Sequence, residues 1–409
     1  MDNKTYLLAQ EQLLETISLR VNHLKRIASE PNGNENAYDF AVAEFYSHLN
    51  DIVEFSISSP GFTALTDFTP HGLMRNLCDR TAKVMRAPYA HIGFGGSSLS
   101  MLMTVGKILP EWIDKKSGSV VLVDPLCHQS VLGGLDIGKW QAVKLHRDYV
   151  SSLGLAAPLK LETVEAAVKA NGSRKVAALV YNPISYDGFR NLEEEKKVFS
   201  FCEERNIKVI GDFAWSPFYG FEGFDEQPGT LLDNCHLCIT SPHKKGMFPS
   251  PASVVLYRDY SLRRMFIEAG RLGWATTSPH YGTLMLIDYR LVLIEKGAVS
   301  ERLTKISNSS KYLRENIGQL SDDIMVVEPC QVEATYQDPS HLILSSHQSR
   351  VDCRDLAYWL KQNACLDLEK STAQTALFLV GSSHIPKCSE IISIFSEAIT
   401  SIKLSGATK

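Results

Sequence analysis

A lysine that follows a short apolar run is the residue in this sequence whose position best suits covalent chemistry. Lys244 closes the segment Ser-Pro-His-Lys at residues 241–244, directly after the strand-like run 237–240. An amine at a strand end can condense with an aldehyde once desolvation or a nearby cation lowers its pKa. Lys245 is a rival in the same segment, and a surface turn would accommodate either lysine.

An acidic residue ends another apolar run. Asp212 follows residues 208–211, where a carboxylate is costly to ionise without a cationic partner. A protonated pyridine nitrogen would supply that partner, and the ion pair would keep the ring acting as an electron sink. Ala214, two residues further on, could lie flat on the same ring. The alternative for Asp212 is a helix cap.

Two more segments offer groups for a phosphate and a flat ring. Gly96, Ser97 and Ser98 stand between a strand-like run at 90–94 and a helical run at 99–108. Small residues there free backbone N–H groups to meet a phosphate, and the hydroxyls add donors. His128 follows the run 119–123 and could stack its imidazole on a cofactor ring. For an isolated histidine, a polar loop or a helix cap is the commoner role.

Alternating helices and apolar strands must position these groups. The strand candidates are residues 90–94, 119–123, 142–145, 176–181, 208–211, 237–240 and 252–257. Such runs, separated by helices, predict an α/β fold with a mainly parallel seven-stranded sheet covered on both faces. Ligands bind at the carboxyl ends of such strands, where all four segments lie.

The flanking regions have a different texture. Residues 4–29 and 37–49 predict helices, and Ser56–Pro70 predicts an irregular strap. After residue 300 the sequence predicts a helix at 300–317, strands at 324–328, 341–344 and 375–380, a helix at 353–362 and a final helix. We therefore expect an N-terminal helical segment (1–65), a large domain (66–299) and a small α+β domain (300–409).

Composition excludes several classes of protein. The 409 residues are 44% hydrophobic and 22% charged, with a net charge of −4, so neither a nucleic acid nor an acidic membrane is an expected partner. Nine scattered cysteines favour reduced thiols, and Cys235 and Cys238 lack the second pair that a zinc site needs. No stretch has the ~18–20 apolar residues of a membrane span. A cytoplasmic protein without a metal is expected.

Taken in order, the motifs resemble the major domain of the ornithine/lysine/arginine decarboxylases, which are fold-type I pyridoxal-phosphate (PLP) enzymes with the aspartate-aminotransferase-like fold. The matching segments are Gly96-Ser97-Ser98, His128-Gln-Ser130, Ser185-Tyr186-Asp187-Gly188, Asp212-Phe-Ala214-Trp215, Ser241-Pro-His243-Lys244 and Thr276-Thr277-Ser278-Pro279-His280-Tyr281. The resemblance runs from about residue 70 to about residue 395.

The resemblance implies a role for each matching residue. Lys244 would form a Schiff base with PLP, and Asp212 would pair with the ring nitrogen. His128 and Ala214 would sandwich the ring, and the phosphate would be bound by Ser97, Ser98 and Ser241. His243 would lie beside the lysine, near the bond that breaks, and either Lys244 or His243 would return a proton to Cα. Gly96 and Trp215 would complete the cofactor site, and Thr277 or Ser278 would reach the partner's site in a homodimer.

The resemblance implies decarboxylation of a basic amino acid, namely arginine, lysine or ornithine. The bond broken at Cα depends on the pocket. An aminotransferase, a lyase, a PLP-dependent oxidase and an inert PLP-binding paralogue therefore stay open as alternatives.

The sequence departs from the family at Ser58-Ser59-Pro60-Gly61-Phe62, where many members have Pro-Gly-His. We also expect it to lack the wing domain and extra C-terminal domain of the long members. Candidates for gripping a distal cation are Asp187, Glu222 and Asp225, although each also suits a turn or a solvated position.

Overall fold

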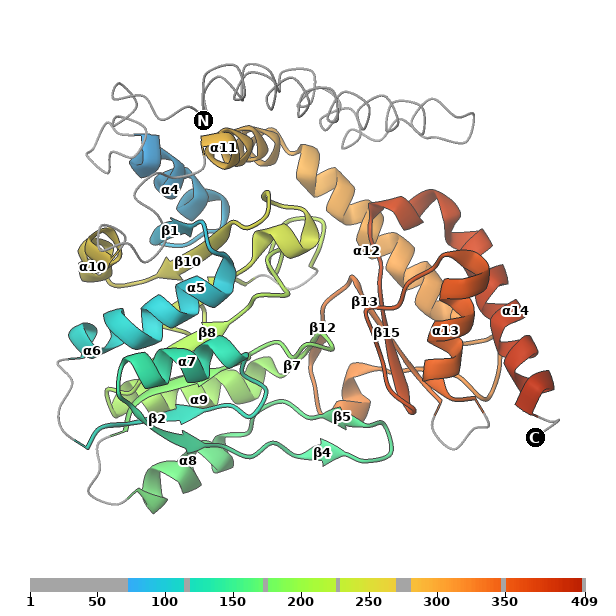
Figure 1. The fold of residues 1–409 in the computed structure, drawn as a ribbon, viewed down its shortest axis with the longest axis horizontal. Helices are drawn as coiled ribbons and strands as arrows, with labels where there is room; N and C mark the ends of the chain where they lie inside the picture. The colour runs from blue at the N-terminus through green and yellow to red at the C-terminus, as the bar shows by residue number, and fades with distance from the viewer. Residues whose placement is uncertain are drawn as a thin grey trace, which may run out of the picture.

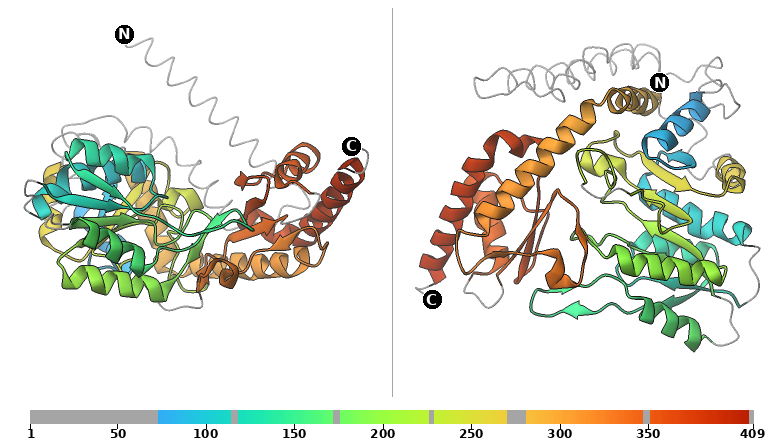
Figure 2. Two further views of the ribbon diagram at one scale, coloured as in Figure 1. Left: turned by 90° about the horizontal axis from the view of Figure 1, so that it is seen from below. Right: turned by 180° about the vertical axis from the view of Figure 1, so that it is seen from behind.

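The computed structural model describes residues 73–113, 118–171, 176–225, 229–269, 281–346 and 351–406. The helices expected at 4–29 and 37–49, the strap Ser56–Pro70, and the site candidates Thr277 and Ser278 lie outside these ranges. Figures 1 and 2 show a larger α/β part, which holds the first sheet, beside a smaller C-terminal part.

A seven-stranded sheet forms the centre of the larger part. Its order is β1 (Tyr89–Gly93), β10 (Ser253–Tyr257), β9 (Leu237–Thr240), β8 (Lys208–Asp212), β6 (Val176–Tyr181), β2 (Val120–Val123) and β3 (Gln141–Lys144). The five strands from β9 to β3 run parallel, whereas β10 is antiparallel to both of its neighbours. All seven expected strands form, so the predicted mainly parallel sheet is confirmed.

Helices cover both faces of this sheet. One face packs against α4 (Leu73–Val84), α8 (Leu161–Ala170), α9 (Leu192–Glu204) and α11 (Tyr281–Glu295). The other packs against α5 (Gly96–Met103), the π-helical turn η2 (Thr104–Ile108), α7 (Gln129–Ile137) and α10 (Ser261–Ala269). Within β2, Val120 and Leu122 join the first core, and Val121 and Val123 join the second. This explains the unbroken apolar runs in the sequence, because a strand covered on both sides has no solvent face.

A smaller antiparallel sheet forms the C-terminal part. Its order is β11 (Met325–Val326), β13 (His341–Ser345), β15 (Thr375–Leu379) and β14 (Lys370–Ser371). It packs with α12 (Ala298–Ile317), α13 (Cys353–Ala364) and α14 (Cys388–Gly406). The strand expected at 324–328 pairs over only two residues, because Glu328 caps the short helix η5 (Pro329–Val332) and Pro329 has no N–H to donate.

The two parts meet through paired backbone and a shared apolar cluster. Strand β7 (Phe189–Arg190) pairs antiparallel with β12 (Tyr336–Gln337), although about 145 residues separate them in the chain. Phe189 packs in one buried cluster with Val332 and Ile343. This junction brings the loop between β12 and β13 close to the carboxyl edge of the first sheet, where Asp338 contacts Lys245.

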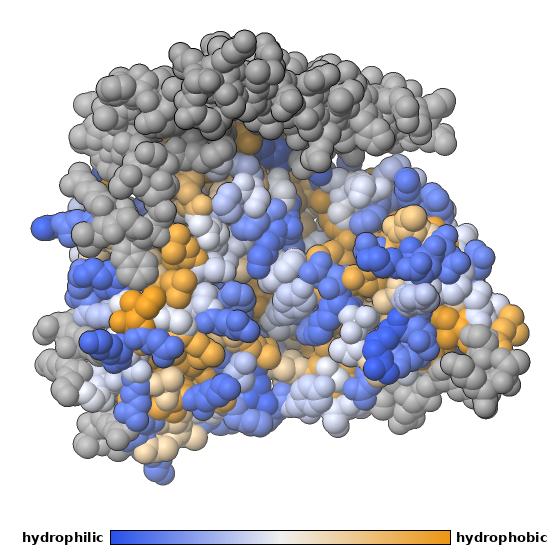
Figure 3. Space-filling model, in the orientation of Figure 1, coloured by the Kyte–Doolittle hydropathy of each residue, from blue (hydrophilic) through white to orange (hydrophobic). Residues whose placement is uncertain are grey.

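The surface face drawn in Figure 3 mixes polar and apolar residues. Within the described ranges, no helix combines the length and the apolar character that crossing a bilayer requires. The same ranges contain no cluster of three or more His, Cys, Asp or Glu side chains arranged to hold a metal ion.

Candidate active site

The four segments singled out in the sequence meet at a cavity of about 230 Å³ beside the strand ends. Every predicted site residue that the structure describes lines this cavity: Gly96, Ser97, Ser98, His128, Asp212, Ala214, Trp215, Ser241, His243 and Lys244. They come from segments that follow β1, β2, β8 and β9, whose ends lie at one edge because these four strands run in the same direction.

Lys244 lies on the 3-10 turn η3 (Pro242–Lys245), which begins one residue after Ser241, and Ser241 itself follows β9. The Nζ of Lys244 is 4.5 Å from the centre of the Trp215 ring system. Desolvation lowers the pKa of Lys244, opposed by the carboxylates of Asp212 and Glu369. A lowered pKa leaves more of the amine unprotonated, the form that attacks an aldehyde.

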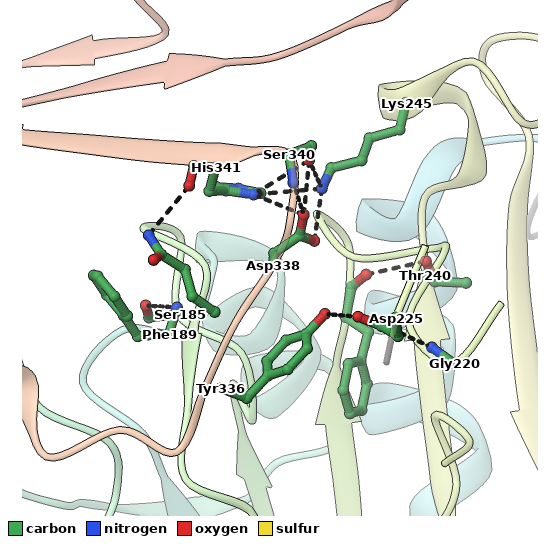
Figure 4. Close-up of polar contacts among 12 residues, drawn as sticks. Ser185, Phe189, Gly220, Asp225, Thr240, Lys245, Tyr336, Asp338, Ser340 and His341 are labelled. Carbon is green, nitrogen blue, oxygen red and sulfur yellow. Dashed lines mark hydrogen bonds and ion pairs between the residues drawn. The ribbon is translucent and has the colours of Figure 1, made fainter. Parts of the chain in front are cut away.

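The neighbouring Lys245 is committed to a different set of contacts. Its Nζ donates to Asp338 Oδ2 at 2.7 Å and to Ser340 Oγ at 2.8 Å, and Figure 4 shows both partners arriving from the loop before β13. His341 Nδ1 lies 3.1 Å from the other Asp338 oxygen. The Lys245 side chain is only 9% exposed and that of Asp338 is fully buried. The geometry therefore favours Lys244 as the reactive amine.

Asp212 ends β8 as a buried carboxylate with one local hydrogen bond. Its Oδ1 accepts from the Ala214 N–H at 3.0 Å. Burial raises the pKa of Asp212, opposed by this hydrogen bond and by the nearby ammonium of Lys244. A cation bound in the cavity would favour the ionised form, which is what a protonated ring nitrogen would do.

His128 caps a helix and also lines the cavity. It is the N-cap of α7, with Nδ1 accepting from the Ser130 N–H at 3.2 Å and lying 2.9 Å from Ser130 Oγ. Its ring also lines the cavity. The cap fixes the orientation of the imidazole, so the capping role supports a stacking role.

The first turn of α5 forms the end of the cavity suited to a phosphate. Gly96 begins this helix with a φ of 70°, a backbone conformation that glycine adopts readily. Its N–H donates to Pro251 O at 2.7 Å, and Ser97 and Ser98 follow on the cavity wall. His243 adjoins this end and has Nδ1 2.7 Å from Ala252 O. Unbonded N–H groups of a first helical turn attract anions.

Sequence reasoning missed a buried ion pair that joins three strand ends. Asp124, just after β2, accepts from Arg147 Nε at 2.9 Å and from the Asn182 N–H at 2.9 Å. Arg147, three residues after β3, also donates to Asn182 O at 2.7 Å, and Asn182 follows β6. The signal was an Asp directly after an apolar strand, the same pattern that identified Asp212.

The three carboxylates proposed for a distal cation do not line the cavity. Asp187 pairs with Lys370 at 2.8 Å, and Asp225 accepts from the Tyr336 hydroxyl at 2.7 Å and from the Gly220 N–H at 2.5 Å. Glu222 is exposed. Glu369 does not line the cavity either, but it accepts a hydrogen bond from the hydroxyl of Tyr186, which does.

Lys244 also lines a second, larger cavity of about 540 Å³. It lies between η3, helices α11 and α12, and the segment after β15. Its charged lining residues are Lys244, Lys245, Arg290, Glu301, Arg302 and Lys305. Glu301 is the one carboxylate among these described residues, and it pairs with Lys305 at 2.8 Å.

Comparison with known proteins places this geometry in a family. The model of the family described as Orn/Lys/Arg decarboxylase, major domain, matches residues 46–374. The chain belongs to the Orn/Lys/Arg decarboxylase family. Family membership confirms both the predicted resemblance and pyridoxal phosphate as the predicted cofactor.

Relatives of this Orn/Lys/Arg decarboxylase family member are distant in sequence. An arginine decarboxylase of Halalkalibacterium halodurans is 22% identical over 321 residues, which are 76% of this chain and 61% of that protein. The chain thus spans about three fifths of the length of the curated relative that it matches.

Solved structures share the fold. The constitutive lysine decarboxylase of E. coli aligns with a TM-score of 0.67 at 18% identity, over 93% of this chain and 57% of that one. Lysine decarboxylase A of Pseudomonas aeruginosa aligns with a TM-score of 0.67 at 20% identity, over 84% of this chain and 52% of that one. A sphingosine-1-phosphate lyase of Burkholderia pseudomallei aligns with a TM-score of 0.69 at 14% identity, over 98% of this chain and 92% of that one. The predicted aspartate-aminotransferase-like fold is confirmed.

The cavity of this family member has polar atoms in place for a polar ligand. Among the described residues, Asn182 Oδ1, Ser216 Oγ and Ser241 Oγ are buried without a hydrogen-bond partner, and all three residues line the cavity. A buried polar atom left unbonded costs about 1–3 kcal/mol. A phosphorylated pyridine ring offers donors and acceptors to such atoms, so the residues present fit the cofactor.

Proposed function

We propose that this chain is a PLP-dependent decarboxylase of a basic amino acid, with arginine, lysine or ornithine as the substrate class. The observation that carries the proposal is the position of Lys244, whose amine lies at the strand-end cavity with a lowered pKa and faces Trp215. Family membership and the similarity to an arginine decarboxylase support the substrate class.

Each side of the cofactor would have its own residues. Lys244 would hold the aldehyde carbon, Asp212 would keep the ring nitrogen protonated, and His128 and Ala214 would lie on the two ring faces. The phosphate would be bound by Ser97, Ser98 and Ser241, at the start of the helix that Gly96 begins. His243 would adjoin the phosphate, and Trp215 would complete the cavity wall. When bound, the cofactor supplies an electron sink for the carbanion left at the substrate Cα.

The residues of the chain then control protons and water. The carboxylate of Asp212, buried at the end of β8, would keep the ring nitrogen protonated and so maintain the electron sink. Lys244, in its ammonium form, would donate a proton to the substrate Cα after carbon dioxide leaves. His243 has its Nδ1 held at Ala252 O and adjoins the phosphate end of the cavity, which favours a binding role over proton donation.

We further propose the domain organisation that the sequence pattern predicts and the homodimer that the resemblance implies. Residues 66–299 would form the PLP-binding domain and 300–409 the small domain, after an N-terminal helical segment at 1–65. Two chains would form a homodimer in which Thr277 or Ser278 reaches the partner's site. We also propose a cytoplasmic location, without a metal or nucleic-acid partner, which the composition supports.

A substrate screen tests the reaction. Purified protein loaded with PLP is incubated with arginine, lysine and ornithine, and the products are identified by mass spectrometry. The expected result is the decarboxylated amine with carbon dioxide. A keto acid would indicate an aminotransferase, ammonia or another fragment would indicate a lyase or oxidase, and no turnover of any of the three would contradict the proposal.

The identity of the cofactor-bearing lysine is tested by absorbance. Lys244→Ala should lose the visible band of lysine-bound PLP, whereas Lys245→Arg should keep it because Lys245 holds Asp338 and not the cofactor. Retention of the band in Lys244→Ala, or its loss in Lys245→Arg, would sink this assignment.

A further inference from the structure

One short loop of the C-terminal part contacts two segments of the wall of the strand-end cavity. The loop between β12 and β13 places Asp338 against Lys245, the neighbour of Lys244 on η3. The backbone N–H of Asp338 donates to Gly188 O at 2.8 Å, in the tight turn that contains Tyr186. Lys244 and Tyr186 both line the cavity. Asp338 therefore joins the turn of the reactive amine to a second part of the cavity wall.

The contact between this loop and η3 is buried and hydrogen-bonded at both carboxylate oxygens. Lys245 Nζ donates to Asp338 Oδ2 at 2.7 Å and to Ser340 Oγ at 2.8 Å, as Figure 4 shows. Asp338 Oδ1 accepts from the N–H of Ser340 at 3.0 Å and from its hydroxyl at 2.7 Å. Burial alone would raise the pKa of Asp338, but the ammonium of Lys245 holds it well below its usual value. An ionised pair with this many directed bonds defines one geometry.

The contact between this loop and the turn at Gly188 is close packing of a ring on backbone. Gly188 has a φ of 88°, and a Cβ there would lie 2.8 Å from Cγ of His341. His341, the first residue of β13, is fully buried, with Nδ1 3.1 Å from Asp338 Oδ1. A shift of Asp338 would therefore also move the ring that packs on the turn containing Tyr186.

Turn η3 has a further anchor within the larger part of the molecule. Arg290 of α11 donates to the carbonyl of Gly246, and its Nε donates to Met247 O at 3.0 Å. These bonds hold the chain directly after η3 without any contribution from the C-terminal part. Loss of the Lys245 contact would therefore leave η3 formed but able to shift relative to Tyr186.

We propose that Lys245 and Asp338 are positioning residues, which set where the amine of Lys244 stands relative to the ring of bound PLP. The inference rests on the proposed function and goes beyond it, because it gives a role in the reaction to a buried pair outside the strand-end cavity. Proton transfer to Cα needs the amine at a defined place, and a misplacement of ~1 Å can cost about 100-fold in rate. The pair therefore acts on the rate of the reaction rather than on substrate binding.

The test removes the link without leaving a buried charge. Lys245→Met combined with Asp338→Asn removes both charges, whereas one buried charge left alone would destabilise the protein. In the full chain loaded with PLP, we expect kcat for the basic substrate to fall about 10- to 100-fold, with little change in KM. The visible circular dichroism of bound PLP, which reports how the ring is held, should weaken. The urea midpoint should stay near that of the unmodified protein.

Three further variants serve as controls. Lys245→Arg keeps a cation that can pair with Asp338, so its kinetics and dichroism should lie closer to the unmodified protein than to the double variant. Ser340→Ala removes one of the two acceptors of Lys245 and should weaken the same signals less. Asp367→Asn breaks an exposed pair with Lys361 at 2.8 Å, lines neither cavity, and should behave like the unmodified protein.

The dichroism keeps the inference separate from the reaction, because it is measured on bound PLP whether or not any amino acid is decarboxylated. Absence of turnover in the unmodified protein would contradict the proposed function alone. A double variant with the dichroism of the unmodified protein would overturn the positioning role. If the double variant does not fold, Ser340→Ala decides, and a change in its urea midpoint without a change in dichroism or kcat would show a structural role instead.

Discussion

Two adjacent lysines have opposite environments in this protein. Lys244 stands in an open cavity beside Trp215, and Lys245 is buried against Asp338 and Ser340. A buried ammonium is tolerated because its partner is ionised and itself hydrogen-bonded. The pair also holds η3, which carries Lys244, against the C-terminal part. The contact therefore stabilises both the fold and the position of the reactive amine.

Breaking the buried pair should destabilise the protein. Asp338→Asn leaves the Lys245 ammonium buried without a counter-charge, so we expect the free energy of unfolding to fall by about 3–5 kcal/mol. Urea denaturation measures this loss. Asp367→Asn breaks the exposed pair with Lys361 and should cost under ~1 kcal/mol. A loss in Asp338→Asn no larger than in this control would show that the buried pair contributes little.

At the scale of elements, the start of α5 decides how the phosphate end is built. The helix begins at Gly96, whose positive φ turns the chain from β1 into the helix. A Cβ at Gly96 would stand 4.0 Å from both His243 Cε1 and Pro251 O, so space alone does not exclude a side chain. The left-handed backbone conformation disfavours a side chain there, because it costs residues other than glycine about 1–2 kcal/mol.

Gly96→Ala should therefore weaken PLP binding by shifting the first turn of α5. We expect the dissociation constant of PLP to rise about 10-fold, as measured by absorbance titration, since relaxing the strained φ turns the N–H groups of Ser97 and Ser98 away. Gly118→Ala is the control, because Gly118 has a φ of 78° with open space around its Cβ position and precedes β2 at the opposite edge of the sheet. Equal PLP affinity in the two variants would contradict the proposed phosphate loop.

At the scale of the whole molecule, buried histidines make the fold sensitive to acid. His236 Nδ1 accepts the Val209 N–H at 3.0 Å, and the ring packs against Phe199 at 5.1 Å. Burial lowers the pKa of His236 to about 4, helped by the charges of Lys208 and Arg258. Burial likewise lowers the pKa of His91, stacked on Phe266, to about 4. Both rings are neutral in the folded protein near neutral pH.

The sign of the pH dependence follows from these values. Between pH ~6.5 and about 4, the histidines of the unfolded chain bind protons that those of the folded protein do not. The free energy of unfolding is therefore unaffected by these histidines above pH ~6.5 and falls as the pH is lowered below that value. The slope is at most about 1.4 kcal/mol per pH unit for each histidine. Urea midpoints should thus be lower at pH 5 than at pH 7. His236→Asn should reduce this difference, and the exposed His146→Asn should not. An unchanged difference in His236→Asn would contradict the prediction.

The sequence alone determined the sheet and the edge at which the site forms. Short continuous apolar runs that alternate with helices favour strands covered on both faces, and residues that follow parallel strands meet at one edge of the sheet. This is why the residue pattern by itself assigns Asp212, His128, Gly96 and Lys244 to one cavity. Local spacing carries that information, because each of these residues lies within a few positions of its strand.

Only the tertiary structure decided the contacts between distant segments. Lys245 is held by Asp338, 93 positions away, which favours Lys244 as the reactive amine, and Glu369 reaches Tyr186 across 183 positions. Arg147 likewise meets Asp124 only because β2 and β3 are neighbours in the sheet. Such pairs depend on strand order and on how the two parts pack through β7 and β12. No periodicity in the sequence encodes that packing, because it is set by which apolar surfaces fit together.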